Sequence, residues 1–291
     1  MSKGKIMKST ILVAGIGLLI LFATGCDKLR SRDALNHGVQ AYKGAHYTEA
    51  VDYFKNAVQL DPENTMPRLY LATAYMSQYI PGAESPENMQ LAKEAKEEFL
   101  KVLEKNPSDT TALASLASLS YQQAQGVPDL DQKLKKLDEA KEWYLKLIAA
   151  DPQNKEGFYS LAVIDWVKWY AAWTKARQDL GLKPEEAGPL KDKKVKADLQ
   201  AQYSAVIDDG MKNLQKALDI DPQYDDAMAY MNLLIREKAD LDDTPEQYKA
   251  DTDTADKWVQ KALDTKKMKA AKAAAAATQG GITAEDPAST K

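Results

Sequence analysis

The sequence has few of the residues on which catalysis, metal binding and covalent stabilisation usually depend. Its 291 residues include one cysteine and two histidines. A single cysteine cannot form an intramolecular disulfide bond, so packing alone must hold the fold together. The histidines, His37 and His46, are not spaced with other histidines, cysteines or carboxylate pairs as ligands of one metal ion. We therefore predict no metal site and no cofactor.

Sequence motifs of enzymes are also missing. The chain has no G-x-S-x-G, no H-E-x-x-H and no phosphate-binding G-x-x-x-x-G-K. Carboxylate pairs such as Asp208-Asp209 and Asp242-Asp243 do occur, but we expect them near helix starts and turns, where they cap free amides. We predict a protein that is not an enzyme. An unrecognised enzyme is a further alternative, which a convergent pair of buried carboxylates or a bound metal in a structure would revive.

Positive charge does not exceed negative charge. The 39 Lys and Arg residues are outnumbered by 43 Asp and Glu residues, which gives a formal net charge of −4. Binding of DNA or RNA depends on a clustered basic surface, and no basic stripe follows the regular part of this chain. The sequence therefore predicts no nucleic-acid partner.

The main positive feature is a repeated proline that closes an amphipathic run. It occurs at Asp61-Pro62, Asn106-Pro107, Asp151-Pro152 and Asp221-Pro222, with spacings of 45, 45 and 70 residues. Proline lacks an amide donor and disfavours helical geometry in the residue before it, so each proline ends a helix. Helical segments that end at regular intervals indicate a solenoid, in which neighbouring repeats bury each other's apolar faces.

The same pattern precedes each proline: a small residue twelve positions before it, an aromatic eight before, and a small or aliphatic residue five before. The first copy is Ala50, Phe54 and Ala57, and the aromatic position is Phe99, Tyr144 and Leu214 in the next three. Small residues let two antiparallel helices approach to about 8 to 10 Å. A second apolar run lies upstream of each copy, so we predict two helices per repeat.

This pattern resembles the tetratricopeptide repeat. Residues 31–64 follow the 34-residue pattern of that family, and the resemblance covers roughly residues 31–265. The matching residues are Gly38, Tyr47, Ala50, Phe54, Ala57, Leu60 and Pro62. The resemblance implies an all-α, right-handed solenoid of about five helical hairpins, some expanded to 45 residues. The expected repeats are residues 31–64, 65–109, 110–154, 155–224 and 225–265.

The first thirty residues resemble the leader of a bacterial lipoprotein. Lys3, Lys5 and Lys8 precede an apolar run over residues 11–22, which is too short to span a membrane, and small residues then precede Cys26. We expect a signal peptide at residues 1–25, lipidation of Cys26 and an anchored linker at residues 26–30. The resemblance implies a bacterial cell envelope protein that faces the periplasm, and it leaves the choice of inner or outer membrane open.

In the family, the first helices of successive repeats line a concave surface, and the resemblance places a column of side chains there. Its members are Tyr42, Met76, Tyr121, Trp166 and, last, Arg236, with Leu69, Tyr159 and Val163 beside them. These residues are predicted either to grip a partner or to pack between adjacent helices, since aromatic stripes at helical spacing are often core.

The fourth repeat departs most from the family period, with 36 inserted residues. Trp166, Trp169, Tyr170 and Trp173 lie on one helical face there. Such a face is predicted to be packing core, a protein interface or a membrane contact. We hypothesise that this hairpin docks a partner through Trp166, Trp169 and Trp173. Residues 180–196 should form an exposed loop. Residues 266–291 should form a tail rich in Lys and Ala, a frayed helix followed by disorder.

The sequence thus predicts a lipid-anchored scaffold of the cell envelope that binds protein partners or peptide segments through the column and the fourth repeat. The alternative is a receptor or transport accessory for a small hydrophobic or glycan ligand. An open apolar surface would favour the scaffold, and an enclosed cavity of a few hundred Å³ would favour the receptor.

Overall fold

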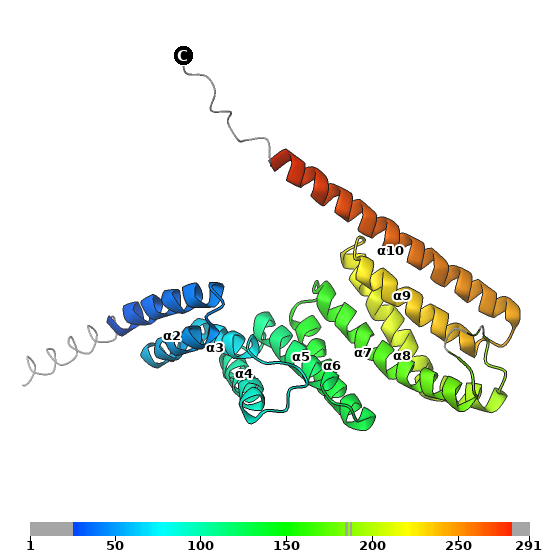
Figure 1. Cartoon of the computed structure of the whole chain (residues 1–291), viewed down its shortest axis with the longest axis horizontal. Coiled ribbons are helices and arrows are strands. Elements are labelled where there is room, and N and C mark those ends of the chain that lie inside the picture. Colours follow the sequence, from blue (N-terminus) through cyan, green and yellow to red (C-terminus); the bar gives the residue numbers. More distant parts are fainter. Residues whose placement is uncertain (1–25, 184–185, 187, 281–291) are drawn as a thin grey trace, which may run out of the picture. The chain divides into compact units, whose positions relative to one another are not determined.

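A computed structural model describes residues 26–183, 186 and 188–280, which form helices and connecting loops without a β-strand (Figure 1). The expected signal peptide, residues 1–25, and the last eleven residues lie outside this part of the chain. The prediction of an all-α fold is confirmed.

The described helices pair into five antiparallel hairpins along the chain. The first hairpin joins residues 26–43 to α2 (Tyr47–Leu60). The others are α3 (Thr65–Met76) with α4 (Pro86–Lys105), α5 (Thr110–Gln125) with α6 (Leu130–Ala150), α7 (Lys155–Asp179) with α8 (Lys193–Ile220), and α9 (Asp225–Lys238) with α10 (Pro245–Gly280). A short 3-10 turn, η1 (Ala239–Leu241), follows α9.

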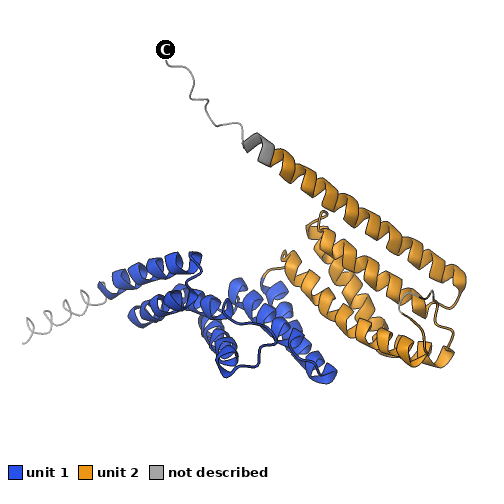
Figure 2. Cartoon of the chain, viewed as in Figure 1, with its two compact units in different colours: residues 1–150 blue, residues 151–291 orange. Residues whose placement is uncertain are grey.

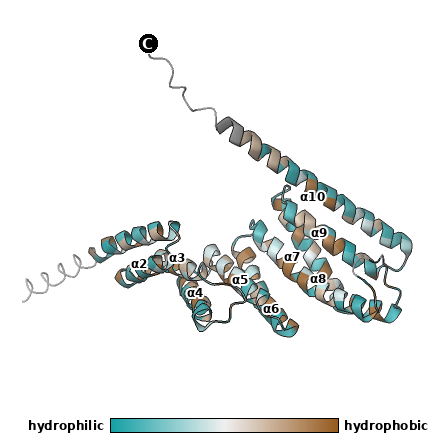
Figure 3. Ribbon diagram, in the orientation of Figure 1, coloured by the Kyte–Doolittle hydropathy of each residue, from teal (hydrophilic) through white to brown (hydrophobic). Residues whose placement is uncertain are grey.

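The hairpins belong to two compact units, shown in Figure 2. The N-terminal unit ends at Ala150 and holds three hairpins, and the C-terminal unit begins at Asp151 and holds two. Within each unit, every helix packs against the next one in sequence. Hydrophobic and hydrophilic residues alternate along these helices, as helices with one buried face require (Figure 3).

One turn joins successive hairpins at all four prolines. The residue two positions after the proline donates its backbone N–H to the carbonyl of the residue before the proline, over 3.0 to 3.1 Å. In three of the turns, the donating residue is Asn or Asp and also caps the next helix. These caps are Asn64 on Met66, Asp109 on Ala112 and Asn154 on Gly157. The same four residues therefore end one helix and begin the next.

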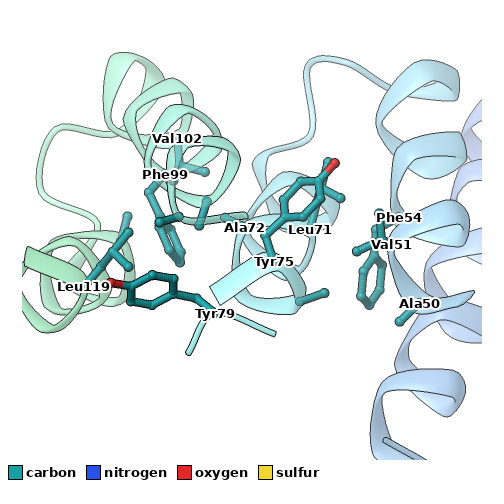
Figure 4. Close-up of a cluster of buried hydrophobic side chains, with 14 of the residues drawn as sticks. Ala50, Val51, Phe54, Leu71, Ala72, Tyr75, Tyr79, Phe99, Val102 and Leu119 are labelled. Carbon is teal, nitrogen blue, oxygen red and sulfur yellow. The ribbon is translucent and has the colours of Figure 1, made fainter. Parts of the chain in front are cut away.

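The core of the N-terminal unit consists of the residues that the repeat pattern picks out. Phe54 and Phe99 are fully buried and share one core with Ala50 (Figure 4). Ala57 and Ala95 are fully buried as well. A Cβ atom at Gly38 would come within 2.5 Å of the Phe54 ring, so a larger residue there would separate the first two helices. Small residues thus permit the close helix contacts that the sequence predicts.

The expansions of the second and third hairpins lie partly in longer helices and partly in their loops. The α4 helix has 20 residues, against 14 in α2. Asn88 is buried and ties the preceding loop to α4, because its side chain bonds to both backbone groups of Ile80 and to the carbonyl of Ala83. The loop of the second hairpin is therefore held in place by specific contacts.

The loop of the fourth hairpin differs from its prediction. The segment was expected to be exposed over residues 180–196, but α8 already begins at Lys193 and Leu190 is only 3% exposed. Arg177 donates to the carbonyls of Lys183 and Glu186, both over 2.7 Å, and so draws the loop onto the helices. Sequence composition could not reveal this contact.

The tail from residue 266 was predicted to be a frayed helix followed by disorder. The helical part is present, because α10 continues to Gly280. Side chains from Lys266 to Ala276 are exposed, so this part of the helix extends past the core. Lys269 pairs with Asp225 at the start of α9 and ties the extension to the unit. Its high alanine content also favours a helix.

Candidate functional site: the apolar column and the polar core beside it

In the N-terminal unit, the column residues Tyr42, Met76 and Tyr121 are half-buried and sit towards the ends of the first helices of their hairpins. Tyr42 and Met76 pack against the core on one side. The Tyr42 hydroxyl also lies 2.8 Å from the Ser77 hydroxyl, which fixes the ring between two hairpins. These side chains contribute to packing and still expose part of their surface to solvent.

More half-buried apolar residues accompany the column. Leu35 and Val39 lie on the first helix, and Leu69 lies on α3. The first helices therefore carry a partly exposed apolar stripe, which we call the apolar column together with Tyr42, Met76 and Tyr121. A surface of this kind contributes binding energy when a partner removes it from water.

In the C-terminal unit, Tyr159 and Trp166 belong to a ladder of aromatic rings that joins α7 to α9. The centroid of the Tyr230 ring lies 5.5 Å from that of Tyr159 and 5.2 Å from that of Trp166, in edge-on arrangements in both cases. Tyr170 stacks on Trp166 at 4.9 Å. Aromatic pairs in these geometries stabilise the packing of two helices. Tyr170 is 38% exposed.

Trp169 and Trp173 do not lie on a surface, which corrects their predicted role in docking. Trp169 is fully buried, and Trp173 is 8% exposed and donates its indole N–H to Asp240 over 2.7 Å. Side chains in these positions cannot contact a partner without unfolding of the unit. The α7 helix buries residues on most of its sides, so the spacing of its aromatics did not identify an exposed face.

Arg236, the last residue of the predicted column, pairs with Asp256 on α10 and donates to Asn232 over 3.3 Å. At this position of the predicted column, the side chain is therefore charged and already paired. The apolar column in the strict sense belongs to the N-terminal unit.

Sequence analysis missed a buried polar cluster in the C-terminal unit. Arg177 and Asp240 are 2% and 3% exposed and form an ion pair. Glu237 is 6% exposed and accepts the indole N–H of Trp166. Burial raises the pKa of Glu237 to about 8, and the charge of Asp240 adds to this shift. Charged residues inside otherwise apolar helices were the signal that could have located the cluster.

Neither Cys26 nor the histidines build a reactive site. Cys26 is an exposed free cysteine at the start of the described residues. The side chains of His37 and His46 are mostly exposed and lie next to Asp33 and Glu49. In the part of the chain that the structure describes, no three His, Cys, Asp or Glu residues are placed to hold a metal ion. No helix within these residues is long and apolar enough to cross a membrane.

Two cavities bear on the question of a small ligand. One of about 250 Å³ lies in the N-terminal unit between the loops of the second and third hairpins, and one of about 210 Å³ lies in the C-terminal unit beside α8. Residues of the apolar column line neither of them. The column therefore does not form the wall of either cavity.

Comparison with known proteins agrees with this architecture. The tetratricopeptide repeat family matches residues 130–154, which cover α6 and the turn after it. The crystal structure of MamA protein aligns with 83% of this chain and 94% of its own, at 16% identity and a TM-score of 0.50. A second crystal structure of MamA covers 80% of this chain and 96% of its own, with the same identity and TM-score. No curated protein sequence matches the chain.

A further MamA structure, residues 41 to the end of the protein from Desulfovibrio magneticus RS-1, covers 82% of this chain and 96% of its own at 16% identity, with a TM-score of 0.48. At such identities the likeness concerns the fold alone. The fold is therefore that of the tetratricopeptide-repeat solenoids. One repeat, in the third hairpin, matches the tetratricopeptide repeat family, and the likeness to solved structures concerns the fold.

Proposed function

We propose that this protein is a scaffold that binds protein partners along the apolar column of its N-terminal unit. The observation that carries the proposal is the partial exposure of Tyr42, Met76 and Tyr121, three large side chains at one position of three successive hairpins. Repeat proteins use such extended surfaces for binding. An extended or helical apolar peptide segment fits a column of this kind better than a compact ligand does.

The proposed location is the bacterial cell envelope, with a lipid on Cys26 and the hairpins facing the periplasm. This part of the proposal rests on the sequence pattern around Cys26, and the exposure of that residue is compatible with it. Changing Cys26 to Ser should move the protein from the membrane fraction to the soluble fraction and abolish incorporation of labelled fatty acid. A C26S variant that still fractionates with membranes and carries label would contradict the lipid anchor. That result would have no bearing on the proposed binding at the apolar column.

The binding proposal is tested with a crosslinking pull-down from envelope membranes. The test variant changes Tyr42, Met76 and Tyr121 to Ala together. The matched control changes Met89, Leu130 and Leu145 to Ala, because these are exposed apolar residues on second helices, with exposures of 53%, 43% and 46%. We expect wild type and the control variant to capture specific envelope proteins, and the test variant to capture none of them.

Circular dichroism and thermal unfolding of both triple variants establish that each still folds. Equal capture by the test variant and wild type would contradict the column as a binding surface. A receptor for a small hydrophobic or glycan ligand is supported less, because such a ligand needs an enclosed apolar cavity lined by the column, and the two cavities described above have other walls.

A further inference from the structure

The second half of α10 is strongly basic. Residues 257–280 contain six lysines and one acidic residue, Asp264, whereas the whole chain has a formal net charge of −4. We call residues 257–272 the basic arm. Its lysines are Lys257, Lys261, Lys266, Lys267, Lys269 and Lys272. Positive charge is therefore concentrated in one element of an otherwise acidic protein.

The basic arm leaves the core of the C-terminal unit after Thr265. This residue is 9% exposed, and its hydroxyl lies 3.7 Å from the sulfur of Met228 on α9. Lys269 pairs with Asp225 one turn later. All side chains of residues 266–276 are exposed, and Figure 1 shows α10 running past the helices of its own unit. The arm is thus a helix that is fixed at its start and open to a partner along its length.

The carboxylates near the arm already have partners. Asp256, just before the arm, pairs with Arg236 on α9, and Asp264 accepts the side-chain amide of Gln260 over 2.8 Å. Among the described residues, Lys269 is the one lysine of the arm that pairs with a carboxylate. The other five lysines keep their charges for a partner outside the unit.

Four residues of the arm form a stripe along one side of the helix. Spacings of four, seven and four residues bring Lys257, Lys261, Met268 and Lys272 to the same side. The three lysines are exposed, and Met268 is 36% exposed. A flat surface can therefore meet three ammonium groups and one apolar side chain at once.

An anionic lipid bilayer presents a surface of this kind. Lysines within a Debye length of anionic headgroups are each attracted to them, and their long apolar stems let the ammonium groups stay at headgroup level. Met268 can then enter the boundary between headgroups and acyl chains. The rest of the arm beyond Thr265 is mainly alanine, so the helix would lie on the surface without deep insertion.

Nucleic acid matches the arm less well. The arm contains no arginine, the residue that binds phosphate and base edges through two parallel hydrogen bonds. Its exposed apolar residues, Met268 and Leu263, have no phosphate to contact, whereas a bilayer offers them acyl chains.

We propose that the basic arm binds the surface of an anionic phospholipid bilayer through Lys257, Lys261 and Lys272, with Met268 in the interface. This surface is separate from Cys26 and from the apolar column. The inference therefore depends neither on the lipid anchor nor on the binding of protein partners, and each can fail alone.

The experiment measures sedimentation with vesicles. It uses residues 26–291 with Cys26 changed to Ser, which keep both compact units whole and exclude the apolar run of residues 11–22 and any acyl chain as causes of binding. At low salt we expect at least about tenfold tighter binding to phosphatidylcholine vesicles that contain phosphatidylglycerol than to pure phosphatidylcholine vesicles. High salt should remove this preference.

The test variant changes Lys257, Lys261 and Lys272 to Gln, which keeps helix propensity and removes three charges. It should bind the anionic vesicles at least about tenfold more weakly than the unchanged arm. These side chains are exposed, so the variant should keep its fold, which circular dichroism checks.

The matched control changes Lys175, Lys212 and Lys249 to Gln. These lysines are exposed in the same unit but lie outside the arm, and each pairs with an aspartate three or four positions away. The control has the same net charge as the test variant and should bind like the unchanged protein.

Three results would overturn the proposal: equal binding to the two kinds of vesicle, equal binding of the test variant and the unchanged arm, or tighter binding to duplex DNA than to the anionic vesicles. If the test variant does not fold, the lipid preference and its salt dependence in the unchanged arm decide the matter.

Discussion

The indole nitrogen of Trp166 lies 3.1 Å from each carboxylate oxygen of Glu237, which follows it by 71 residues in the chain. The bond joins α7 to α9 inside the C-terminal unit. Glu237 is 6% exposed, and burial raises its pKa from the ordinary value of 4.5 to about 8. The carboxyl group is therefore protonated in the folded protein at neutral pH.

This pKa makes the stability of the C-terminal unit depend on pH. Between about pH 4.5 and 8 the folded state holds a proton on Glu237 that the unfolded state has released, so the free energy of unfolding falls as pH rises. The slope from this one group reaches about 1.4 kcal/mol per pH unit. The contribution is fully present below pH 4.5 and is lost by about pH 8.

Glu237→Gln removes this dependence, because the amide keeps the shape and stays uncharged. We expect wild type to lose roughly 2 to 4 kcal/mol relative to this variant between pH 5 and 8, measured by urea unfolding. The exposed Glu142→Gln variant controls for the loss of one carboxyl group and should follow wild type. If the free energy of unfolding changed with pH in the same way for wild type and E237Q, the raised pKa of Glu237 would be contradicted.

A second prediction concerns the ion pair of Arg177 and Asp240. Arg177→Met leaves Asp240 charged and buried and removes the donors to the carbonyls of Lys183 and Glu186. We expect a loss of about 3 to 5 kcal/mol in the free energy of unfolding.

The control for this prediction is Lys175→Met. Lys175 lies two positions before Arg177 in α7, and the change breaks an exposed ion pair with Asp179. Its cost should stay below about 0.5 kcal/mol. A cost under about 1 kcal/mol for Arg177→Met would show that the buried pair does not hold the loop.

A third prediction concerns the close approach of two loops in the N-terminal unit. A Cβ atom at Gly126 would lie 2.6 Å from the backbone nitrogen of Gly82 and 2.8 Å from its Cα atom. Gly126→Ala should therefore cost about 1 to 3 kcal/mol, since a backbone must move. Gly44→Ala, whose Cβ meets nothing nearer than 3.4 Å, should change stability by less than about 0.5 kcal/mol in thermal unfolding. Equal effects of the two changes would contradict the contact.

A fourth prediction separates packing from docking in α7. Trp169→Ala should cost about 3 to 5 kcal/mol, because it leaves a cavity in the core. Tyr170→Ala, at a ring that is 38% exposed, should cost less than about 1.5 kcal/mol. Urea unfolding of both variants measures the difference. A Trp169→Ala variant as stable as wild type would restore the predicted surface role of this residue.

The repeat pattern predicted the fold because its signals are local. Proline ends a helix through its own geometry, and residues such as Ala50 and Phe54 mark the buried face at fixed spacing. Hairpin boundaries follow from these two signals. The tail beyond residue 266 was predicted to be a frayed helix followed by disorder, and composition could not place the end of that helix, because Lys and Ala suit both a solvated helix and a disordered tail.

The C-terminal site could not be predicted in the same way. The spacing of the α7 aromatics placed Trp166, Trp169 and Trp173 on one face, but which side of α7 faces solvent depends on α8, α9 and the loop after α7. The partner of Arg177 lies 63 residues away, and no local pattern indicates a contact at that distance. Long-range contacts decide which aromatic residues remain accessible.

The four-residue turn at each proline stays the same while the hairpins between turns change in length. The α3 and α4 pair and the much longer α7 and α8 pair both start and end at this turn. Additional residues accumulate at the far ends of the hairpins, where they extend the arms or form loops. The length of a hairpin can therefore change in this scaffold while the connections between hairpins keep their geometry.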